Sequence, residues 1–369
     1  MPERPADIFR TFLDRATGHH LVTACAADAA GLAAAELARR WLSARAGATP
    51  EIIFPERGRL LIGPALADRA RQARAEALLA LDLGADDSAA LPDGPTLFLD
   101  QHRHGRCTTA HVIGPGPEPR PAGLVLYEIL REIDADLCHG GSCPAVSSAP
   151  ATTSADLAWL AAIVAEGGHP RLTLPPDAAT AAHLSKTSVR EAAVLLNSAG
   201  RAADYPVAAT LAALASADGP AALVAGDSPA CVALQEARTE VLREFGHWSH
   251  QRPHFMWRVA LVPVASPCRI EAILAAMWER QLPAYMIVVA NSGVAAGWVT
   301  VIARTASPER NLLRLLDAVA PAGSPVQALG RRDYVEAVVP VAAWREMLAK
   351  MRFRNPGKLV PPAEGASLF

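Results

Sequence analysis

Short, continuous apolar runs alternate with helical segments through the first half of the chain. His20–Ala24, Ala77–Leu81 and Thr96–Leu99 are apolar runs, whereas Leu32–Ala44 repeats its large apolar residues at helical spacing. A strand without polar alternation is buried on both faces, which is typical of a parallel sheet covered by helices. We therefore predict an α/β fold whose N-terminal domain is a doubly wound parallel sheet.

The pattern changes in the second half of the chain. Pro229–Trp248 is one amphipathic helical run, and from Arg258 onward strands and helices alternate again in a shorter block. The helical run predicts inward-facing side chains at Cys231, Leu234, Val241 and Leu242. We expect an N-terminal domain over 1–225, a connector helix over 226–252, a smaller α/β C-terminal domain over 253–355 and a flexible tail over 356–369.

One uncharged stretch, residues 282–303, is long enough to suggest a membrane span. Asn291-Ser292-Gly293 and Gly297 interrupt it, so a turn between two strands, Met286–Ala290 and Trp298–Ala303, is predicted instead. Residues 1–14 lack the apolar core of a secretory signal. A soluble protein without membrane contact is expected.

Composition narrows the classes of function. The 369 residues include 35 Lys and Arg against 37 Asp and Glu, a formal net charge of −2. That balance provides no global positive field for a polyanion, so any nucleic-acid contact requires a local patch. The six cysteines are scattered rather than arranged as a disulfide framework, which favours a reducing, cytoplasmic location.

Ligands bind at the carboxyl ends of strands in open parallel sheets, so residues that follow the apolar runs are the first candidates for a site. The first apolar run, His20–Ala24, is followed by Asp28. The second run, Ala77–Leu81, is followed by Asp82-Leu83-Gly84, and the third, Thr96–Leu99, by Asp100-Gln101-His102. A predicted helix ends at Glu166-Gly167-Gly168. These four places make up the candidate site.

In their order and spacing, these places resemble the motifs of the DHH phosphoesterase superfamily, whose RecJ-type members are manganese-dependent nucleases. The segment Asn197-Ser198-Ala199-Gly200-Arg201 is also similar to a helical segment of that family. Val299–Leu316 is similar to the DHH-associated C-terminal domain, so the resemblance covers about residues 18–350. It implies a two-domain phosphoesterase fold in which paired divalent ions hydrolyse a phosphodiester.

The resemblance assigns metal-ligand roles to Asp28, Asp82 and Glu166, and a catalytic phosphate contact to His102. At three further ligand positions the chain departs from the family pattern, carrying Ala26, Ala30 and Gln101. Alanine binds no metal, and a two-ion centre needs about five or six ligands. The three carboxylates therefore suit at most one Mn²⁺ or Mg²⁺ ion, and a dinuclear centre is doubtful.

In the C-terminal domain the resemblance assigns substrate binding to Arg304, Gly330 and Arg331. The family's Gly-Gly-Gly-His loop corresponds to Ala328-Leu329-Gly330-Arg331, in which one glycine remains and Arg331 replaces the histidine. Together with Arg332 the two arginines could clasp a phosphate, or they could be solvated surface groups, and both interpretations are open.

Three functions follow from these expectations, in order of preference. The first is a homologue of RecJ-like phosphoesterases that has lost most of its dinuclear centre and binds a nucleotide, a short oligonucleotide or single-stranded nucleic acid as a pseudoenzyme. The second is an active single-metal phosphodiesterase for small nucleotides or short oligonucleotides, since near-neutral charge argues against long DNA. The third is a scaffold that binds a protein partner.

Overall fold

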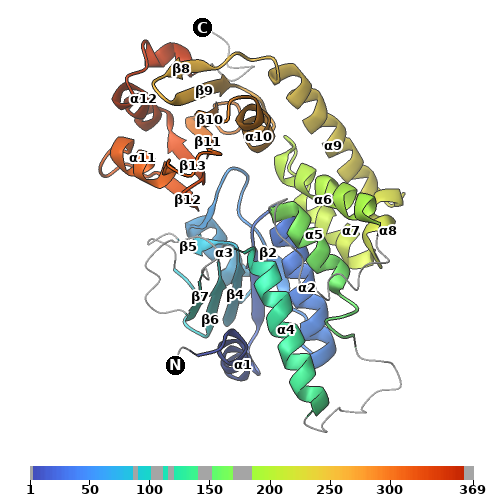
Figure 1. Cartoon of the computed structure of the whole chain (residues 1–369). Coiled ribbons are helices and arrows are strands. Elements are labelled where there is room, and N and C mark those ends of the chain that lie inside the picture. Colours follow the sequence, from blue (N-terminus) through green and yellow to red (C-terminus); the bar gives the residue numbers. More distant parts are fainter. Residues whose placement is uncertain are drawn as a thin grey trace. The chain divides into compact units, whose positions relative to one another are not determined.

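The computed structural model describes residues 3–85, 90–100, 111–114, 120–139, 152–168 and 185–360 (Figure 1). The chain divides into two compact units. The first unit comprises Met1–Glu56, Leu61–Ala199 and Pro206–Gln235, and the second comprises Arg57–Leu60, Gly200–Tyr205 and Glu236–Phe369. Both units are α/β, as the alternation of strands and helices predicts.

A five-stranded parallel sheet forms the centre of the first unit. Its strand order is β2 (Glu51–Ile53), β1 (Leu21–Cys25), β4 (Ala77–Leu81), β6 (Thr96–Leu99) and β7 (His111–Ile113). The chain leaves β1 toward β2 and then returns to β4 on the other side of β1. The strand order therefore reverses between β1 and β4, and the carboxyl ends of these two strands border the crevice where ligands bind in such sheets.

Helices cover both faces of this sheet, which explains why β1 and β4 are buried along their whole length. On one face, Leu66 and Ala70 of α3 (Pro64–Gln72) pack against Val22 and Leu78 of the strands. The helices α1 (Pro5–Ala16), α2 (Ala29–Ala46) and α4 (Ala122–His139) pack on the other. The doubly wound arrangement is thereby confirmed for the described residues.

Small residues let the helices of the first unit approach closely. At Gly123 of α4 a Cβ atom would lie 2.7 Å from the Cβ of Ala34 on α2 and 2.9 Å from Val164 on α5 (Ala158–Gly168). Such contacts between small side chains are how an alanine-rich sequence reaches the packing density of a protein interior. The strands β3 (Leu61–Ile62) and β5 (Gly84–Ala85) pair in parallel and form a separate two-stranded sheet.

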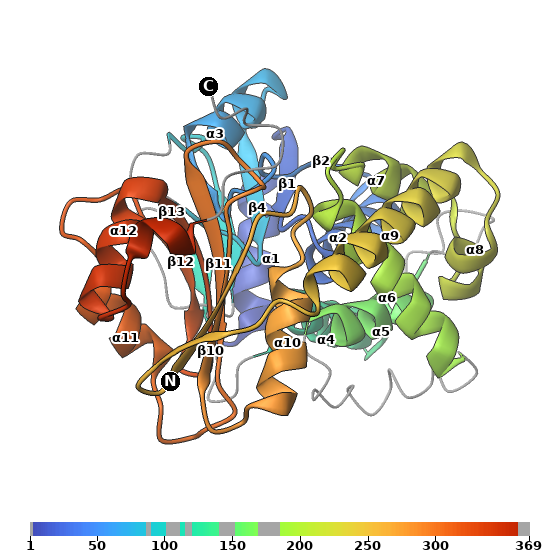
Figure 2. The ribbon, with the colours of Figure 1, turned by 90° about the horizontal axis from the view of Figure 1, so that it is seen from above.

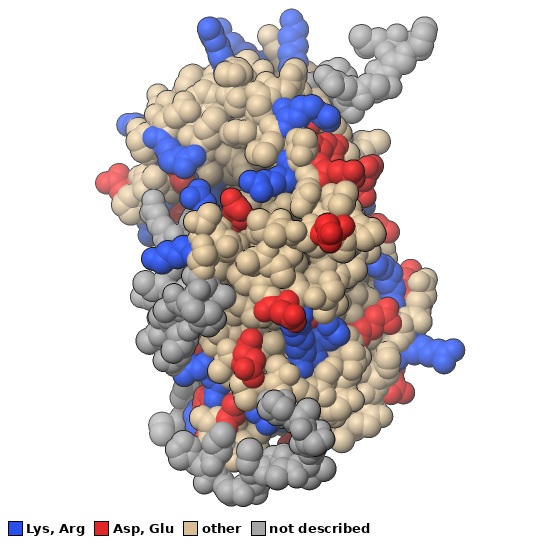
Figure 3. Space-filling view, turned by 90° about the vertical axis from the view of Figure 1, so that its right-hand side faces the viewer, with Lys and Arg blue, Asp and Glu red and all other residues tan. Residues whose placement is uncertain are grey.

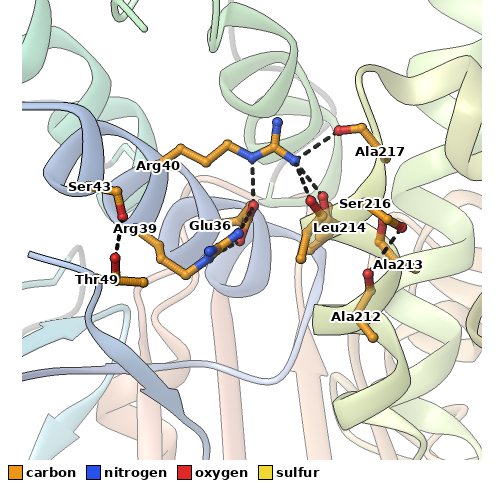
Figure 4. Close-up of polar contacts among 11 residues, drawn as sticks. Glu36, Arg39, Arg40, Ser43, Thr49, Ala212, Ala213, Leu214, Ser216 and Ala217 are labelled. Atoms are coloured by element: carbon orange, nitrogen blue, oxygen red, sulfur yellow. Dashed lines mark hydrogen bonds and ion pairs between the residues drawn. The ribbon is translucent and has the colours of Figure 1, made fainter. Parts of the chain in front are cut away.

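A buried ion network joins α2 to α7 (Val207–Ser216) (Figure 4). Glu36 is 1% exposed and accepts hydrogen bonds from the guanidinium groups of Arg39 and Arg40, at 2.6–2.7 Å. Arg40 also donates to the carbonyl oxygens of Leu214, at 2.6 Å, and Ala217, at 2.8 Å. A cation placed at these carbonyls satisfies acceptors that the end of α7 leaves open.

Four further helices follow in the chain: α6 (Lys186–Arg201), α7, α8 (Pro220–Ala225) and α9 (Pro229–Trp248). The bounds of α9 are those predicted from the sequence. Cys231, Leu234 and Val241 are buried as expected, whereas Leu242 is 53% exposed, so its predicted inward orientation is wrong. The next residue along a helix points about 100° away, and the buried stripe already includes Val241.

The second unit is built on a six-stranded mixed sheet. Its order is β12 (Gln327–Arg331), β13 (Tyr334–Pro340), β11 (Trp298–Arg304), β10 (Met286–Asn291), β9 (Val259–Val264) and β8 (His254–Met256), in which β9 and β10 are parallel and the other pairs antiparallel. The predicted strand pair is confirmed as β10 and β11. No helix in the described part of the chain has both the length and the apolar character to cross a bilayer.

Helices cover both faces of the second sheet as well. In Figure 2, α11 (Leu312–Val319) and α12 (Val341–Lys350) lie to its left and α10 (Glu271–Gln281) to its right. A 3₁₀ helix, Pro356–Leu359, follows α12, and Leu359 is buried in the same core as Trp344 of α12. The first four residues of the predicted tail therefore have regular structure with Leu359 buried, and the predicted domain limits stay a prediction. Residues 361–369 lie outside the described part.

Candidate functional site

Asp28 occupies the turn from β1 into α2 and caps the helix. Its backbone is extended, and its Oδ1 accepts a hydrogen bond from the backbone N–H of Gly31 at 2.8 Å. A carboxylate at this position satisfies an open N–H group and complements the helix dipole. Gly31 is needed for the turn, because a Cβ there would lie 2.3 Å from the carbonyl oxygen of Ala26.

Asp82 follows β4 in a similar structural role. Its two carboxylate oxygens lie 3.3 and 3.2 Å from the backbone N–H of Ala122, the first residue of α4. Its own N–H donates to the carbonyl oxygen of Leu99 at 2.9 Å, and its side chain is buried. The φ angle of Asp82 is +52°, a left-handed conformation that is uncommon outside glycine and often found at functional sites.

Both carboxylates act on the thiol of Cys25. The thiol is fully buried at the end of β1, and burial raises its pKa, with the negative charges of Asp28 and Asp82 adding to that shift. Both carboxylates therefore lie close enough to act on the same sulfur atom. The structure thus brings together two of the three predicted metal ligands, at the point where the strand order reverses.

A third carboxylate, Asp100, follows β6 at this edge and was not among the predicted ligands. It is 8% exposed, and its N–H donates to the carbonyl oxygen of Ile113 at 3.3 Å. The sequence signal for it was its position directly after a buried strand, the same signal that singled out Asp82. Gln101 and His102 lie outside the described residues, so the predicted catalytic role of His102 stays a prediction.

Glu166, the third predicted ligand, lies in the last turn of α5 and is exposed. The adjacent Gly167 packs against the start of α2, where a Cβ would lie 2.7 Å from that of Ala29. The Asn197 side chain of α6 reaches the same turn, and its Oδ1 accepts a hydrogen bond from the N–H of Ala29 at 3.0 Å. The helices α5 and α6 therefore both abut the β1–α2 turn, and Asn197 positions it.

The described side chains at this edge do not by themselves make up a two-ion metal centre. Asp28 and Asp82 accept hydrogen bonds from backbone amides, while Ala26 and Ala30 offer only methyl groups. Among the residues that the structure describes, no group of three or more His, Cys, Asp or Glu is arranged to hold a metal ion. A paired-ion site needs more oxygen and nitrogen donors than these.

In the second unit, the predicted substrate-binding arginines lie in one row across three strands. Tyr334 of β13 is in register with Arg304 of β11 on one side and with Arg331 of β12 on the other. The Arg304 guanidinium lies 5.8 Å from the centre of the Tyr334 ring and pairs with Glu279 at 3.1 Å. Arg331 pairs with the half-exposed Asp333 at 2.7 Å.

Gly330 precedes Arg331 and lies against β13 more closely than a larger residue could. A Cβ at Gly330 would lie 2.5 Å from the carbonyl oxygen of Tyr334. The glycine therefore lets the β12–β13 hairpin close beside the arginine row. Arg304, Gly330 and Arg331 thus lie on neighbouring strands around Tyr334, and their role in substrate binding stays a prediction.

A charged network supports this row from within the sheet. The Tyr334 hydroxyl hydrogen-bonds to Glu336 at 3.3 Å, and burial together with the Glu336 charge raises the pKa of Tyr334 well above its usual value. Arg269 pairs with Glu336. Burial opposes the charge of Arg269, but Glu336 and Glu271 outweigh it and raise the pKa of the guanidinium.

The surface charge agrees with the near-neutral composition. On the face shown in Figure 3, basic and acidic side chains of the described residues are interspersed rather than gathered into one broad area of a single sign. A large electrostatic footprint for duplex DNA is therefore not seen on that face.

Comparison with known proteins gives a clear result for the fold. Neither a protein-family model nor a curated protein matches the sequence. A crystal structure of exonuclease RecJ bound to manganese matches with a TM-score of 0.64 and 16% identity over 97% of both chains. RecJ from Thermus thermophilus in complex with Mn²⁺ gives 0.67 and 14% over 97% of this chain and 55% of that one.

The DHH domain of a member of the s1p family of ribosomal proteins also matches, with a TM-score of 0.59 and 11% identity over 94% of this chain and 88% of the other. Because these matches extend over nearly the whole chain, they include both units in their sequence order. The resemblance predicted from the short motifs is thereby confirmed at the level of structure: the chain has a RecJ-like DHH fold.

Proposed function

We propose that this protein binds a nucleotide or single-stranded nucleic acid with a RecJ-like DHH fold but does not hydrolyse it through a pair of metal ions. The observation that carries this proposal is the use of Asp28 and Asp82 as acceptors for the amides of Gly31 and Ala122, at the starts of α2 and α4. The positions beside Asp28 that supply ligands in the family are alanines.

Ligand number is the physical reason for the proposal. A carboxylate offers about four lone-pair sites, and each backbone N–H that it accepts removes one from metal binding. Asp28, Asp82, Asp100 and Glu166 remain as carboxylate donors, but Asp28 and Asp82 already accept backbone amides, and Ala26 and Ala30 add no donor, so the set falls short of what two divalent ions require. A centre of two divalent ions, which the resemblance implies, is thus not expected here.

The binding half of the proposal is supported by the arginine row. The partner of Arg331, Asp333, is 54% exposed, so this ion pair costs little to exchange for a phosphate. Tyr334 lies between the two arginines and holds them in register. The Arg304 guanidinium donates hydrogen bonds to Glu279 on α10, so Arg304 would orient the ligand rather than bind its phosphate directly.

The first test is hydrolysis. With Mn²⁺ in excess, the protein is expected to release no more nucleotide from labelled single-stranded oligonucleotides than its Asp82→Ala variant does. Manganese-dependent release that Asp82→Ala abolishes would contradict the proposal.

The second test is binding of a fluorescent mononucleotide, followed by anisotropy. Arg331→Ala is expected to weaken binding about tenfold, because a charge-assisted bond to phosphate is removed. Arg71→Ala provides the control, since Arg71 is also an arginine paired with a neighbouring aspartate, Asp68, but lies exposed on α3. Equal affinity of the wild type and Arg331→Ala would remove the arginine row from the proposed site.

A single-ion phosphodiesterase is the second candidate. It is favoured by the positions of Asp28, Asp82 and Asp100 after neighbouring strands β1, β4 and β6, because carboxylates at one edge of a sheet can bind one hard divalent ion with water completing its shell. Under this alternative, Mg²⁺- or Mn²⁺-dependent turnover of a short oligonucleotide would fall in both Asp82→Ala and Glu166→Ala. Turnover that is unchanged in Glu166→Ala excludes the assignment of that ligand.

A further inference from the structure

The turn between β8 and β9 carries a tryptophan that neither burial nor backbone preference explains. Trp257 is the first residue of this two-residue hairpin turn; its side chain is 76% exposed and its φ is +54°. Turns of this length favour Asn or Gly at positive φ, because a bulky side chain is strained there. Among the described residues, the exposed indole makes no core contacts that would offset this strain.

The second observation concerns the residue in contact with Trp257. Arg352 follows α12 with a φ of +65°, at a position where helices usually place glycine. Its guanidinium lies 5.7 Å from the centre of the Trp257 ring. Two exposed, non-glycine residues in the left-handed conformation, from opposite ends of the second unit's sequence, thus meet in one cation–π contact.

Three further arginines lie in this turn or are connected to it through hydrogen bonds from guanidinium groups to backbone carbonyl oxygens. Arg258 is the other turn residue, and its carbonyl oxygen accepts a hydrogen bond from the Arg310 guanidinium at 3.3 Å. The Arg332 Nε in turn donates to the carbonyl oxygen of Arg310 at 3.1 Å. We refer to these five residues as the Trp257 surface: Trp257, Arg258, Arg310, Arg332 and Arg352.

The arginines of the Trp257 surface are not neutralised by ion pairs. In the described part of the chain none of the four forms a salt bridge with a carboxylate, although Glu309 precedes Arg310 and Asp333 follows Arg332. Asp333 is engaged by Arg331. Arg352 lies over the indole, and Arg258, Arg310 and Arg332 follow one another through backbone hydrogen bonds, so four cationic residues are linked in one surface of a protein whose net charge is −2.

We propose that the Trp257 surface binds single-stranded nucleic acid, with an unpaired base stacked on the indole and phosphates held by the arginines. Aromatic faces combined with basic groups are how proteins bind single strands without reading their sequence. Guanidinium groups suit phosphate because they donate two parallel hydrogen bonds. In a duplex the bases are paired and stacked, so the indole face would have no partner.

A peptide added to the edge of the sheet is a less suitable occupant. The strand β8 is an edge strand, but it contains only three residues, His254–Met256, and offers few main-chain hydrogen bonds to an incoming strand. The arginines also lie beyond the strand itself, in the turn and in neighbouring loops. Their positions fit a chain of phosphates better than the backbone of a peptide.

The proposal does not depend on the candidate site of the first unit, and its test is separate. The probe is a fluorescein-labelled (dT)₁₂ oligonucleotide, titrated with the full-length protein and followed by anisotropy at several salt concentrations. Trp257→Ala is expected to weaken binding about 5- to 100-fold, as for the loss of one stacked base, while Trp257→Phe retains most of it. Arg258→Ala and Arg310→Ala are expected to lower the salt slope by about 0.7 for each phosphate that the variant no longer binds.

The matched control is Phe255→Ala. Phe255 is also an exposed aromatic residue of β8, at 52%, but it contacts Tyr285 instead of Arg352. Its substitution is expected to leave the affinity unchanged.

Several outcomes would overturn the proposal: equal affinity of the wild type and Trp257→Ala, an equal effect of Phe255→Ala, or equally tight binding of a blunt 12-base-pair duplex. Binding to vesicles of anionic lipid that Trp257→Ala abolishes, without binding of (dT)₁₂, would assign the surface to a membrane instead. The fluorescent-mononucleotide titration described above separates the two proposals, since Arg331→Ala should reduce mononucleotide binding while Trp257→Ala should not.

Discussion

At the scale of single residues, the aspartates that the sequence marks as metal ligands are also structural. Asp28 caps α2 and Asp82 accepts the first amide of α4, so each stabilises a helix start as well as lining the crevice. Loss of such a cap costs about 1 kcal/mol. Alanine variants of either residue therefore need a measurement of stability before a change in metal or ligand binding is assigned to the site.

The raised pKa of Cys25 predicts a specific dependence of stability on pH. An unfolded cysteine releases its proton near pH 8.5, whereas the buried thiol keeps it, so its contribution is complete below pH 8.5 and is lost as the pH rises. Between pH 8 and 10 the free energy of unfolding of the wild type is expected to fall by about 2 kcal/mol more than that of Cys25→Ala. Urea unfolding at the two pH values measures the difference.

Cys25→Ser serves as the control, because its hydroxyl does not titrate in this range. It should follow the pH curve of Cys25→Ala even if its stability at pH 8 differs. Parallel curves for the wild type and both variants would show that the thiol ionises as readily in the folded protein as in the unfolded chain.

The sequence singled out residues whose chemical type coincides with a strand end, but it missed roles that depend on a partner distant in sequence. Asp28 and Asp82 were recognisable because each follows an apolar run. Asn197 was noted only as part of a similar segment; its hydrogen bond with the N–H of Ala29 joins residues 168 positions apart. Nothing in local spacing reports such an interaction.

At the scale of elements, the β1–α2 turn is the tightest constraint in the candidate site. A methyl group at Gly31 would collide with backbone atoms of Ala26, which cannot move without disturbing β1. Gly31→Ala is expected to lower the free energy of unfolding by about 2–3 kcal/mol. Thermal or urea unfolding provides the measurement.

Gly63→Ala is the matched control for Gly31→Ala. Gly63 also precedes a helix, α3, but a Cβ there would meet no atom within 4 Å, and its φ is negative. Because Gly63 is the N-cap of α3, where alanine is disfavoured, its substitution should cost about 1 kcal/mol, less than Gly31→Ala. Equal effects of the two substitutions would show that the turn at Gly31 is not as closely packed as the structure indicates.

The Glu36 network makes a second prediction at this scale. Arg39 and Arg40 both bind Glu36, but only Arg40 also binds the carbonyl oxygens at the end of α7 and lies over the ring of Trp159, 5.5 Å from its centre. Arg40→Ala is expected to cost about 2 kcal/mol of stability and Arg39→Ala about half of that. Urea unfolding of the two variants tests the order, and a larger loss in Arg39→Ala would contradict it.

The hydrophobic pattern predicts elements well when they are buried on both faces. Continuous apolar runs gave β1, β4 and β6, and helical spacing gave α9 with its observed ends. The burial of single residues at the border of an apolar stripe is harder to predict, as the exposed Leu242 shows. The rotation of a helix about its axis depends on the surface that it packs against.

At the scale of the whole molecule, order and alternation of elements sufficed to predict an α/β fold with two sheets. They did not reveal that Arg57–Leu60 and Gly200–Tyr205 belong to the second unit. Arg57 donates to the carbonyl oxygens of Val294, at 3.0 Å, and Pro267, more than 200 positions away. Periodicity is a local property of the sequence, so it carries no information about such contacts.

The likeness to RecJ structures at 14–16% identity establishes the fold and leaves the chemistry to the residues of this chain. Those residues include carboxylates after β1, β4 and β6 and arginines in the second unit, with Ala26 and Ala30 beside Asp28. Binding without paired-ion hydrolysis is the function that this combination favours.

Calorimetric titration of the metal-stripped protein with Mn²⁺, in parallel with Asp82→Ala, tests this conclusion most directly. We predict at most one weak site in the wild type and no pair of sites with micromolar affinity, because Asp28 and Asp82 already accept backbone amides and Ala26 and Ala30 supply no donor. Binding of two Mn²⁺ ions at micromolar affinity, abolished in Asp82→Ala, would contradict the proposal and indicate an active dinuclear hydrolase.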